Sequence, residues 1–400
     1  MIPVYNGAPY VRNAISTALS QLGSDIEIIV SVDLSDDDSE LIARSFNDPR
    51  LKVFGQSKRL GMTENYRFLI SKAHGEWITI FGQDDAILPY ATCLLRAIAS
   101  QFIDHDVITS RRSFMFWPDT NRALSKYSFI YPIDTRKPRI VSSSRSLLRS
   151  ISGLSEYSEG PQLYTGSFVK LSLIERITEV NQGNFYNYLI PDISSAVNIL
   201  TNSSEYVYLP LPLFLIGSSS RSTGIAIDRS ISESTDSIPS GSLKDFFSNS
   251  TDGIITPGNG VFTSSSWYMY EAFTQSSESK SIRGLTDIRV PLEWLALSAL
   301  RYESSKTGLF STVQEVRYSR MREQAGMPKC FLAFRLSVLY VVVFMRKVSR
   351  RLHAVILLFS RRLILSTEYD QDLFSTESLC EQVTQNRSLR RFLDETTKAN

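Results

Sequence analysis

Residues 26–46 read IEIIVSVDLSDDDSELIARSF, and this stretch decides the fold class. Its first part, Ile26–Val32, carries β-branched residues on both faces, which is typical of a strand buried in a parallel sheet. An acidic turn that begins at Asp33 leads into Asp36–Phe46, where apolar residues recur three and four positions apart. That spacing predicts an amphipathic helix. A buried strand followed by a turn and a helix is the repeating unit of an α/β fold.

The same unit recurs on both sides of this stretch. Two further short apolar runs, Leu51–Phe54 and Trp77–Phe81, predict strands, and Tyr10–Leu22 and Thr63–Ala73 predict helices. The chain opens at Met1, so little sequence remains for a first strand. Residues 1–102 therefore predict an α/β layer with a mainly parallel, Rossmann-like sheet and flanking helices.

The remaining sequence divides into three parts. Residues 103–224 continue the domain less regularly, and residues 225–281 are rich in serine, threonine and glycine, as in a linker or long loop. Residues 282–365 predict a helical C-terminal region, followed by a polar tail at residues 366–400. Within these parts we expect strands at Asp106–Thr109, Tyr206–Leu209 and Leu213–Ile216, and helices at Ser144–Ile151, Asp192–Leu200, Ser264–Thr274, Pro291–Arg322 and Pro328–Leu365.

Composition excludes several classes of protein. With 400 residues, 42% hydrophobic and 21% charged, the chain has the make-up of a globular protein of two or three domains. Lysine plus arginine (43) nearly balances aspartate plus glutamate (41), which argues against a nucleic-acid binder. The three cysteines and three histidines are scattered, so neither a disulfide framework nor a zinc motif is indicated. We expect a reducing compartment, and oxygen ligands for any metal.

The most distinctive C-terminal segment is residues 330–365, CFLAFRLSVLYVVVFMRKVSRRLHAVILLFSRRLIL. It combines apolar runs with arginine and lysine and contains no acidic residue. A helix pair of this composition suits the interface of a bilayer with anionic headgroups. A helical hairpin that packs on the domain or on a second subunit is the equal alternative. We find no leader-like N-terminus and no apolar run of about 18 residues. We therefore expect a cytoplasmic protein, peripheral on the inner membrane.

The strongest chemical signal is residues 81–89, FGQDDAILP, in which two adjacent carboxylates follow a buried strand. In open parallel sheets, ligands bind beyond the carboxyl ends of the strands. Asp84 and Asp85 there suit a divalent cation that bridges a diphosphate, because Mg²⁺ and Mn²⁺ prefer oxygen ligands. A helix N-cap or a solvated loop is the alternative interpretation.

Two other strand ends carry polar residues. Residues 33–39 form a second acidic group, much of which is explained by capping of the following helix. Asp33 precedes the cap and is placed to accept a hydrogen bond from a nucleobase or a ribose hydroxyl. The segment Pro3–Gly7 has the small and polar residues that let backbone approach a planar ligand. We expect the three strand ends to converge on one crevice.

Three stretches together resemble family 2 glycosyltransferases: IPVYNGAPYVRNAISTALSQ, IEIIVSVDLSDDDSELI and RLGMTENYRFLISKAHGEWITIFGQDDAILP. The resemblance is dense over residues 2–102 and thins out towards residue 224. It implies a nucleotide-sugar-binding domain of the GT-A type that transfers a sugar with inversion, usually with Mn²⁺ or Mg²⁺.

The resemblance also implies roles for individual residues. Gln83 stands where the family often has aspartate, and Val32 stands where its acid pair often begins. By position, Pro3, Tyr5 and Asn6 would belong to the family's donor pocket. Asp33 would be the acid that reads the base, and Asn65 would lie on the donor-site helix. Asp84 would lie near the ribose or the sugar, and Asp85 would be the metal ligand.

An inverting transfer also needs a base that deprotonates the acceptor hydroxyl. Asp192, in YLIPDISS, matches the family's acidic residue at the start of a helix after the metal motif. A plain N-cap is the alternative for Asp192, and Glu156, Glu159 and Glu179 are other acids in the region. The segment GSSSRSTG resembles the family's closing loop, in which Arg221 would offset charge on the leaving diphosphate.

The resulting hypothesis is a metal-dependent glycosyltransferase that uses a nucleotide sugar, most plausibly a UDP-sugar. The acceptor would be a glycan or a lipid-linked saccharide in surface polysaccharide synthesis. A non-catalytic nucleotide-binding or scaffold protein of the same fold is the alternative. A nucleotidyltransferase would require a glycine-rich, basic phosphate-binding loop after the first strand, and the sequence there has few glycine and basic residues. The hypothesis requires Asp33, Asp85 and Asp192 to surround one cavity.

Overall fold

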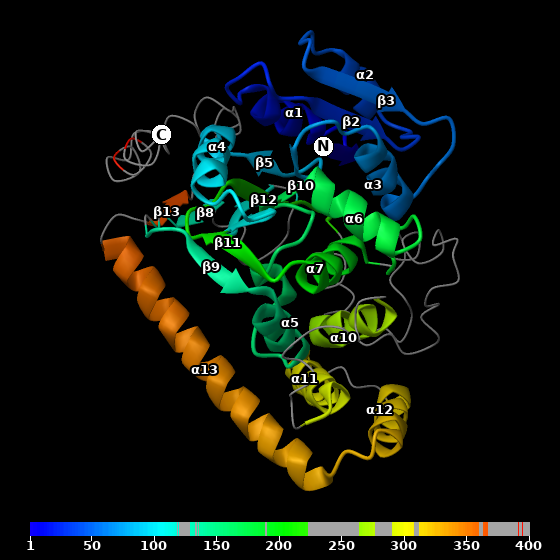
Figure 1. The fold of residues 1–400 in the computed structure, drawn as a ribbon, viewed down its shortest axis with the longest axis vertical. Coiled ribbons are helices and arrows are strands. Elements are labelled where there is room, and N and C mark those ends of the chain that lie inside the picture. The colour runs from blue at the N-terminus through cyan, green and yellow to red at the C-terminus, as the bar shows by residue number, and fades with distance from the viewer. Residues whose placement is uncertain are drawn as a thin grey trace.

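The computed structural model describes residues 1–117, 119, 129–132, 134, 136–188, 190–222, 264–276, 290–307, 312–359, 363–366, 391 and 394. Over these residues the fold is α/β, with a parallel N-terminal sheet, flanking helices and a helical C-terminal region (Figure 1). The predicted α/β class with a helical C-terminal region is confirmed.

The N-terminal sheet is built from three parallel strands in the order β1-β2-β3. They are β1 (Ile2–Val4), β2 (Ile28–Val32) and β3 (Leu51–Gly55). Every residue of β2 is buried, as its β-branched composition predicts. The intervening helices are α1 (Val11–Leu19), α2 (Ser39–Arg44) and α3 (Met62–Ser71). The first strand forms even though only a few residues precede Tyr5.

Register places the strand exits together. Val4 lies opposite Val32, and Val32 lies opposite Gly55, so all three strands end at one edge of the sheet. The segments that follow β1 and β2 therefore start side by side, which is the basis of the candidate site.

Two mixed five-stranded sheets follow. One has the order β4-β10-β6-β11-β9 and the other β13-β8-β7-β12-β5, and within them only β6–β11 and β7–β12 pair in parallel among the described strands. Their strands are β4 (Trp77–Ile78), β5 (Ala86–Ile87), β6 (Val107–Ser110), β7 (Ser113–Phe116), β8 (Phe129–Pro132), β9 (Arg139–Ser142), β10 (Ser167–Lys170), β11 (Glu205–Leu209), β12 (Phe214–Ser218) and β13 (Leu363–Ser366). The mainly parallel pairing expected from the sequence is thus found in the N-terminal sheet. In the other two sheets most of the strand pairs are antiparallel.

The helices cover two hydrophobic cores. The first core joins the N-terminal sheet to α1 and α4 (Ala91–Gln101). The second gathers the helices that follow, which are α5 (Ser143–Ile151), α6 (Leu171–Val180), α7 (Pro191–Asn202), α10 (Ser265–Gln275) and α11 (Leu292–Thr307). Helix α10 falls inside the predicted linker and buries Trp267 and Phe273 in this core. Most of that linker, residues 223–263 and 277–281, lies outside the described residues.

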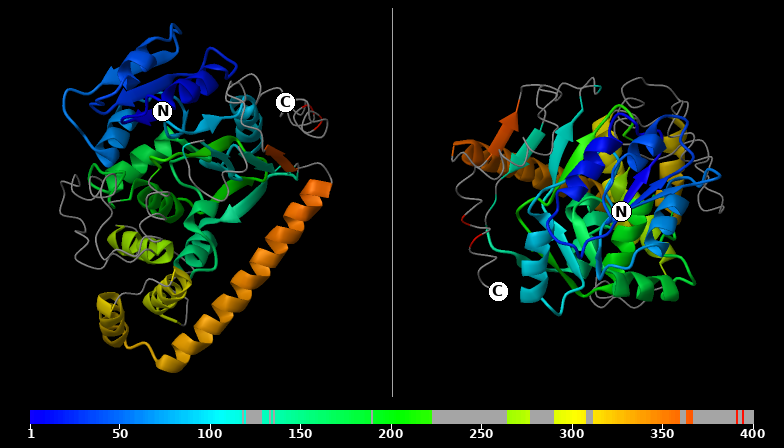
Figure 2. Two further views of the ribbon diagram at one scale, coloured as in Figure 1. Left: turned by 180° about the vertical axis from the view of Figure 1, so that it is seen from behind. Right: turned by 90° about the horizontal axis from the view of Figure 1, so that it is seen from above.

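The C-terminal region differs from the sequence prediction in two ways. The predicted helix pair over residues 328–365 is one continuous helix, α13 (Lys329–Phe359), because no glycine or proline interrupts it. It runs along an outer edge of the molecule (Figures 1 and 2). The predicted helix end at Leu365 is wrong, since Leu363–Ser366 forms β13 and pairs with β8. The predicted helix Pro291–Arg322 is represented by α11 and by α12 (Thr312–Gln324).

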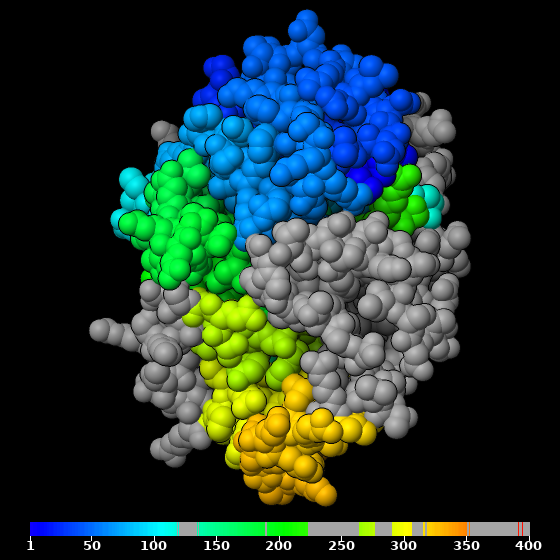
Figure 3. All heavy atoms as spheres, turned by 90° about the vertical axis from the view of Figure 1, so that its right-hand side faces the viewer, coloured from blue at the N-terminus to red at the C-terminus, as the bar shows by residue number. Residues whose placement is uncertain are grey.

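Within the described part of the chain, no individual helix combines the length and the apolar composition needed to cross a bilayer. One bent pair, Tyr318–Gln324 with Lys329–Ser349, meets the criterion jointly at an angle of 117°. In the space-filling view, the N-terminal residues and the beginning of α13 lie at opposite ends of the molecule (Figure 3).

Candidate active site

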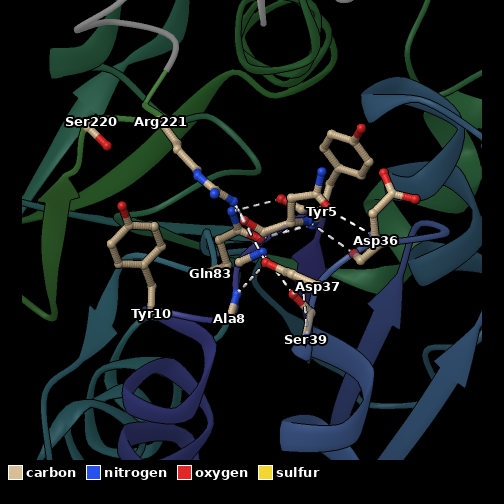
Figure 4. A network of polar contacts seen from close by, with 12 residues as sticks. Tyr5, Ala8, Tyr10, Asp36, Asp37, Ser39, Gln83, Ser220 and Arg221 are labelled. Carbon is tan, nitrogen blue, oxygen red and sulfur yellow. Dashed lines mark hydrogen bonds and ion pairs between the residues drawn. The ribbon is translucent and has the colours of Figure 1, made fainter.

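Four segments meet at the strand exits. Residues 5–8 follow β1, residues 33–39 follow β2, residues 82–85 precede β5, and residues 217–222 begin in β12. Antiparallel pairing of β12 with β5 sets Leu215 opposite Ala86, so the last two segments are neighbours. Figure 4 shows side chains from all four segments in one polar network.

The Gln83 amide joins the first of these segments to the third. It accepts a hydrogen bond from the Tyr5 N–H through Oε1 at 2.8 Å and donates to the Tyr5 carbonyl through Nε2 at 3.1 Å. A carboxylate has no N–H to donate, so an aspartate or glutamate cannot make both bonds. A Cβ on Gly7 would lie 2.2 Å from Gln83 Oε1, so the glycine leaves room for the amide. This explains glutamine where the family often has an acid.

Asn6 and the residues after it are bound to the acidic turn. Asn6 has a φ of 47°, and its side-chain Oδ1 accepts from the Asp36 N–H at 2.8 Å. The Ala8 N–H donates to Asp37 Oδ2 at 3.0 Å, and the Gly7 N–H donates to Ser39 Oγ at 2.8 Å. Much of the acidic turn therefore positions the loop after β1.

Arg221 reaches the same loop from the opposite side. Its guanidinium donates to the Asn6 carbonyl, and Nη1 lies 3.7 Å from Asp37 Oδ2. Figure 4 shows the side chain extending from the end of β12 towards Tyr5. The Tyr5 ring is covered by the Arg59 guanidinium, whose central carbon lies 3.4 Å from the ring centre. The loop predicted for the donor is thus flanked by two arginines.

Asp33 and Asn65 are buried beneath these loops. Asp33 is 2% exposed, and its two oxygens accept from the N–H groups of Leu60 and Gly61 at 2.6 and 2.9 Å. Asn65 is 3% exposed and donates to the Ser31 carbonyl at 3.3 Å. Asp33 therefore fixes the turn that enters α3, which is a structural role the sequence did not predict. Its contact with a nucleobase stays a prediction, as do the donor contacts of Asn65 and of Pro3 in β1.

Asp85 is enclosed by protein donors. It is 1% exposed and accepts from the N–H groups of Gly82 and Gly217 at 2.6 and 2.7 Å and from the Thr165 hydroxyl at 2.6 Å. Burial, and then the neighbouring Asp84 charge, raise the pKa of Asp85 to about 7. This carboxylate ties the segment 82–85 to β12 and to the loop before β10.

Asp84 faces the segment 217–222. Its Oδ2 accepts from the hydroxyls of Ser219 and Ser222 at 2.7 and 2.8 Å, and its carbonyl accepts from Trp117 Nε1 at 2.8 Å. Burial raises the pKa of Asp84 as well. The backbones of Gly217 and Asp84 are also in close contact, because a Cβ on Gly217 would lie 1.7 Å from the Asp84 carbonyl oxygen. The two aspartates thus differ in surroundings, with hydroxyl partners for Asp84 and mainly backbone partners for Asp85.

Three oxygens converge beside Gly82. A Cβ there would lie 2.7 Å from Tyr164 Oη, 3.0 Å from Asp85 Oδ2 and 3.1 Å from Asp84 Oδ1. Two crowded carboxylates with raised pKa values are a donor set that suits a hard divalent cation. Across the described ranges, no group of three or more histidine, cysteine, aspartate or glutamate residues is arranged to hold a metal ion. The residues present fit such an ion when a diphosphate supplies the other oxygens.

Asp192 lies in the first turn of α7. Its Oδ2 accepts from the Tyr157 hydroxyl at 2.7 Å, and Oδ1 accepts from the Ile193 N–H at 3.2 Å. Of the alternative acids, Glu159 is paired with Arg346 of α13 at 2.6 Å, whereas Glu156 and Glu179 are exposed. Asp192 is therefore the acid of this group that adjoins the buried aromatic cluster described next.

Two stacked tyrosines lie next to the paired aspartates. Tyr66 and Tyr164 stack with ring centres 6.1 Å apart. Burial raises the pKa of both hydroxyls, and the charges of Asp84, Asp85 and Asp192 each raise it further. Asp84 and Asp85 therefore lie beside Tyr164, whereas Asp192 is bonded to Tyr157. Asp33 directs its oxygens to residues 60 and 61.

Several participants were missed by sequence reasoning. They are Trp117, Tyr157, Tyr164 and Thr165, which contact the aspartates from elements far away in the chain. No spacing marks them, because Trp117, Tyr157 and the adjacent pair Tyr164 and Thr165 lie in separate parts of the chain. Ser219 and Ser222 lie inside the segment GSSSRSTG, so their hydroxyls were a usable signal.

Comparison with known proteins agrees with this geometry. Residues 1–145 match the family model described as glycosyl transferase family 2. Over this region the chain is similar to that family. An uncharacterized glycosyltransferase of Rickettsia typhi is 40% identical over 89 residues, which cover 22% of this chain and 27% of the relative. The succinoglycan biosynthesis protein ExoO of Rhizobium meliloti is 29% identical over 89 residues, which cover 22% and 26%.

These matches span about a quarter of the length of the curated relatives, 27% and 26%. Among solved structures, residues 1–349 of S. aureus TarS in complex with UDP-GlcNAc align at 14% identity with a TM-score of 0.45. That alignment covers 82% of this chain and 91% of TarS 1–349. The similarity to the family is found over residues 1–145.

Proposed function

We propose that the protein transfers a sugar from a nucleotide-sugar donor to a hydroxyl group of an acceptor, with inversion at the anomeric carbon. The observation that carries the proposal is the pair of buried carboxylates, Asp84 and Asp85, next to the Tyr164 hydroxyl, in a chain whose first 145 residues match the family model. An acidic pair and a separate carboxylate are the two parts that such a reaction needs.

Asp84 and Asp85 are the residues that would hold Mn²⁺ or Mg²⁺. When bound, the ion supplies positive charge to the leaving diphosphate. Asp84 is the better candidate for a direct contact, because its Oδ2 partners are the rotatable hydroxyls of Ser219 and Ser222. Asp85 already accepts three hydrogen bonds from the protein, so we assign it mainly to positioning.

Asp192 is proposed as the general base. In the transfer the acceptor oxygen bonds to the anomeric carbon, the bond to the diphosphate oxygen breaks, and the acceptor proton passes to the Asp192 carboxylate. The Tyr157 hydroxyl donates to Asp192 Oδ2 and so fixes the orientation of the carboxylate. Arg221, next to the Asn6 carbonyl, is near enough to the donor loop to stabilise negative charge on the leaving group.

The finer assignments are proposals of the same kind. We assign the donor as a UDP-sugar and the acceptor as a glycan or a lipid-linked saccharide in surface polysaccharide synthesis. The name of ExoO, a succinoglycan biosynthesis protein, supports a role in polysaccharide synthesis. We place the enzyme at the cytoplasmic face of the membrane, where lipid-linked saccharides are accessible to it.

The test is a screen of nucleotide sugars for hydrolysis and transfer with Mn²⁺, Mg²⁺ or a chelator. We expect one donor to be consumed in a metal-dependent reaction, and we expect Asp192→Asn to retain donor binding by calorimetry while turnover falls by about 10²-fold or more. Glu179→Gln, an exposed acid on α6, is the matched control and should leave turnover unchanged. Binding of a nucleotide without turnover of any donor would support the scaffold alternative and refute the enzymatic proposal.

A further inference from the structure

The outer face of α13 is an unusual surface. Five large side chains on it, Phe334, Val341, Phe344, Met345 and Leu352, are between 58% and 65% exposed. Tyr340, at the border of this face, packs its ring on Tyr302 and shares a hydrogen bond with Ser305 of α11. Single exposed apolar side chains are ordinary on a protein surface, but a contiguous apolar stripe marks an interaction site. The opposite face of the helix is packed, with Leu339 fully buried and Phe331 close to Trp294 at 5.2 Å between ring centres.

The dimensions of the outer face favour a flat partner. From Phe334 to Leu352 the helix rises about 27 Å at 1.5 Å per residue. At 100° per residue, the five side chains span an arc of about 100°. A two-stranded coiled coil uses a narrower seam of apolar residues at two positions of each heptad. Here Ser337 interrupts that seam, whereas a wider stripe suits a surface that covers the side of the helix.

Charge distinguishes between the partners that could cover this face. Helix α13 contains six lysine and arginine residues and no acidic residue. Two of the cations turn inwards, since Arg335 donates to the Ser152 carbonyl at 3.0 Å and Arg346 pairs with Glu159. Lys329 and Lys347 are exposed and, being 18 residues or five turns apart, lie along the same border of the outer face.

A second copy of the chain would bring cations to cations at this face, because α13 supplies no carboxylate to pair with them. A bilayer that contains anionic lipid offers both an apolar layer for the five side chains and negative headgroups for the lysines. Since α13 runs along an outer edge of the molecule, a flat surface has access to it (Figure 2).

We infer that α13 is an interfacial membrane-binding helix, with its outer face in the headgroup region of a membrane rich in anionic lipid and its axis parallel to the surface. The inward-turned arginines hold the helix on the protein, and the outward-turned lysines contact the headgroups. This gives the protein a lipid-binding surface separate from the strand exits.

The experiment is co-sedimentation of the full chain with vesicles of phosphatidylcholine alone and of phosphatidylcholine with phosphatidylglycerol. We expect binding to the anionic vesicles that weakens with salt, and a loss of about tenfold or more in Val341→Glu and Phe344→Glu. Lys347→Glu should weaken binding to the anionic vesicles, because it removes a cation that contacts the headgroups. The control is Leu41→Glu on α2, where the leucine is 71% exposed and far from the outer face, and it should bind like the wild type.

All the substituted side chains are exposed, so we expect each variant to fold. Circular dichroism of each variant checks this. Failure of the wild type to bind anionic vesicles, or full binding by Phe344→Glu, overturns the inference. A wild-type dimer that Phe344→Glu converts to a monomer, with vesicle binding unchanged, overturns it in favour of self-association. Vesicle binding needs no sugar donor, so a negative result leaves the glycosyl-transfer proposal untouched.

Discussion

Gln83 shows how one side chain sets the geometry of a loop. Its amide both donates to and accepts from the Tyr5 backbone. Replacing it by glutamate removes the donor and adds a negative charge beside Asp84. We expect Gln83→Glu to weaken nucleotide binding about tenfold and to lower the free energy of unfolding by about 1 to 2 kcal/mol. Calorimetry with UDP and Mn²⁺, together with urea unfolding, measures the two effects.

Gln101→Glu, an exposed position at the end of α4, is the control for the added charge. If Gln83→Glu and Gln101→Glu both bind and unfold like the wild type, the amide has no role in positioning Tyr5.

We expect substitutions of Asp84 and Asp85 to have different effects on stability and on metal binding. Asp85 accepts from two backbone N–H groups and a hydroxyl, and an amide in its place would turn an N–H towards these donors. We expect Asp85→Asn to lower the free energy of unfolding by about 3 kcal/mol. Asp84→Asn should lower it by less than about 1 kcal/mol yet abolish the metal dependence of nucleotide binding. Equal losses of stability in the two variants would contradict this division of roles.

The sequence predicted where these residues lie better than what they touch. Asp33 follows the buried strand β2, so parallel pairing was enough to locate it at a strand exit. Asp84 and Asp85 were expected after a parallel strand over Trp77–Phe81, but the strand there is only Trp77–Ile78 and it pairs antiparallel with β10. Their partners are contributed by distant connections such as residues 60–61 and 217–222, which no local pattern identifies. Sequence reasoning therefore expected ligands for Asp33 and Asp85, where the structure finds backbone N–H groups.

At the level of elements, β12 and the segment 82–85 act as a single unit. A Cβ on Gly217 would lie 1.7 Å from the Asp84 carbonyl oxygen, and neither backbone can yield without moving the carboxylates. We expect Gly217→Ala to lower the free energy of unfolding by about 2 to 4 kcal/mol and to abolish transfer. Thermal unfolding and the donor assay measure these losses.

Gly75→Ala is the matched control. The new methyl group there would meet only the Trp77 carbonyl, at an ordinary 3.4 Å, so stability should change by less than about 1 kcal/mol. A Gly217→Ala protein as stable and active as Gly75→Ala would show that the two segments move independently.

Element prediction succeeded where a residue's environment follows from its neighbours in the chain. The run Ile26–Val32 and the spacing in Thr63–Ala73 gave β2 and α3 with small errors at the ends. Strand β13 was predicted as helix, because the apolar residues Leu363–Leu365 continue the pattern of α13 and only pairing with β8 makes them a strand. Such pairing depends on contacts more than two hundred residues apart.

For the whole molecule, the acidic pair links stability to pH and metal. The folded-state pKa of Asp85, about 7, is above its ordinary value. This group therefore stabilises the fold at low pH, and its contribution is lost as pH rises through 7. A divalent cation that binds the ionised pair should restore stability, by about 2.7 kcal/mol at a hundredfold excess over Kd. We expect Mn²⁺ to raise the Tm near pH 8 and to have little effect near pH 5.

Calcium-free Mn²⁺ titrations followed by thermal unfolding measure this dependence, and Asp84→Asn should eliminate it. An increase in Tm with Mn²⁺ that is as large in Asp84→Asn as in the wild type would place the ion elsewhere on the protein.

The contact between Arg346 and Glu159 has a consequence for how the two ends of the protein communicate. Arg346 also donates to the Leu154 carbonyl, so α13 is fastened to both sides of the short stretch that carries Tyr157. Tyr157 in turn holds Asp192. A load applied to the outer helix, such as the lateral pressure of a lipid leaflet, would thus be transmitted through two bonded side chains to Asp192, which we propose as the base. Under that proposal, membrane docking would change the rate of transfer as well as the location of the enzyme.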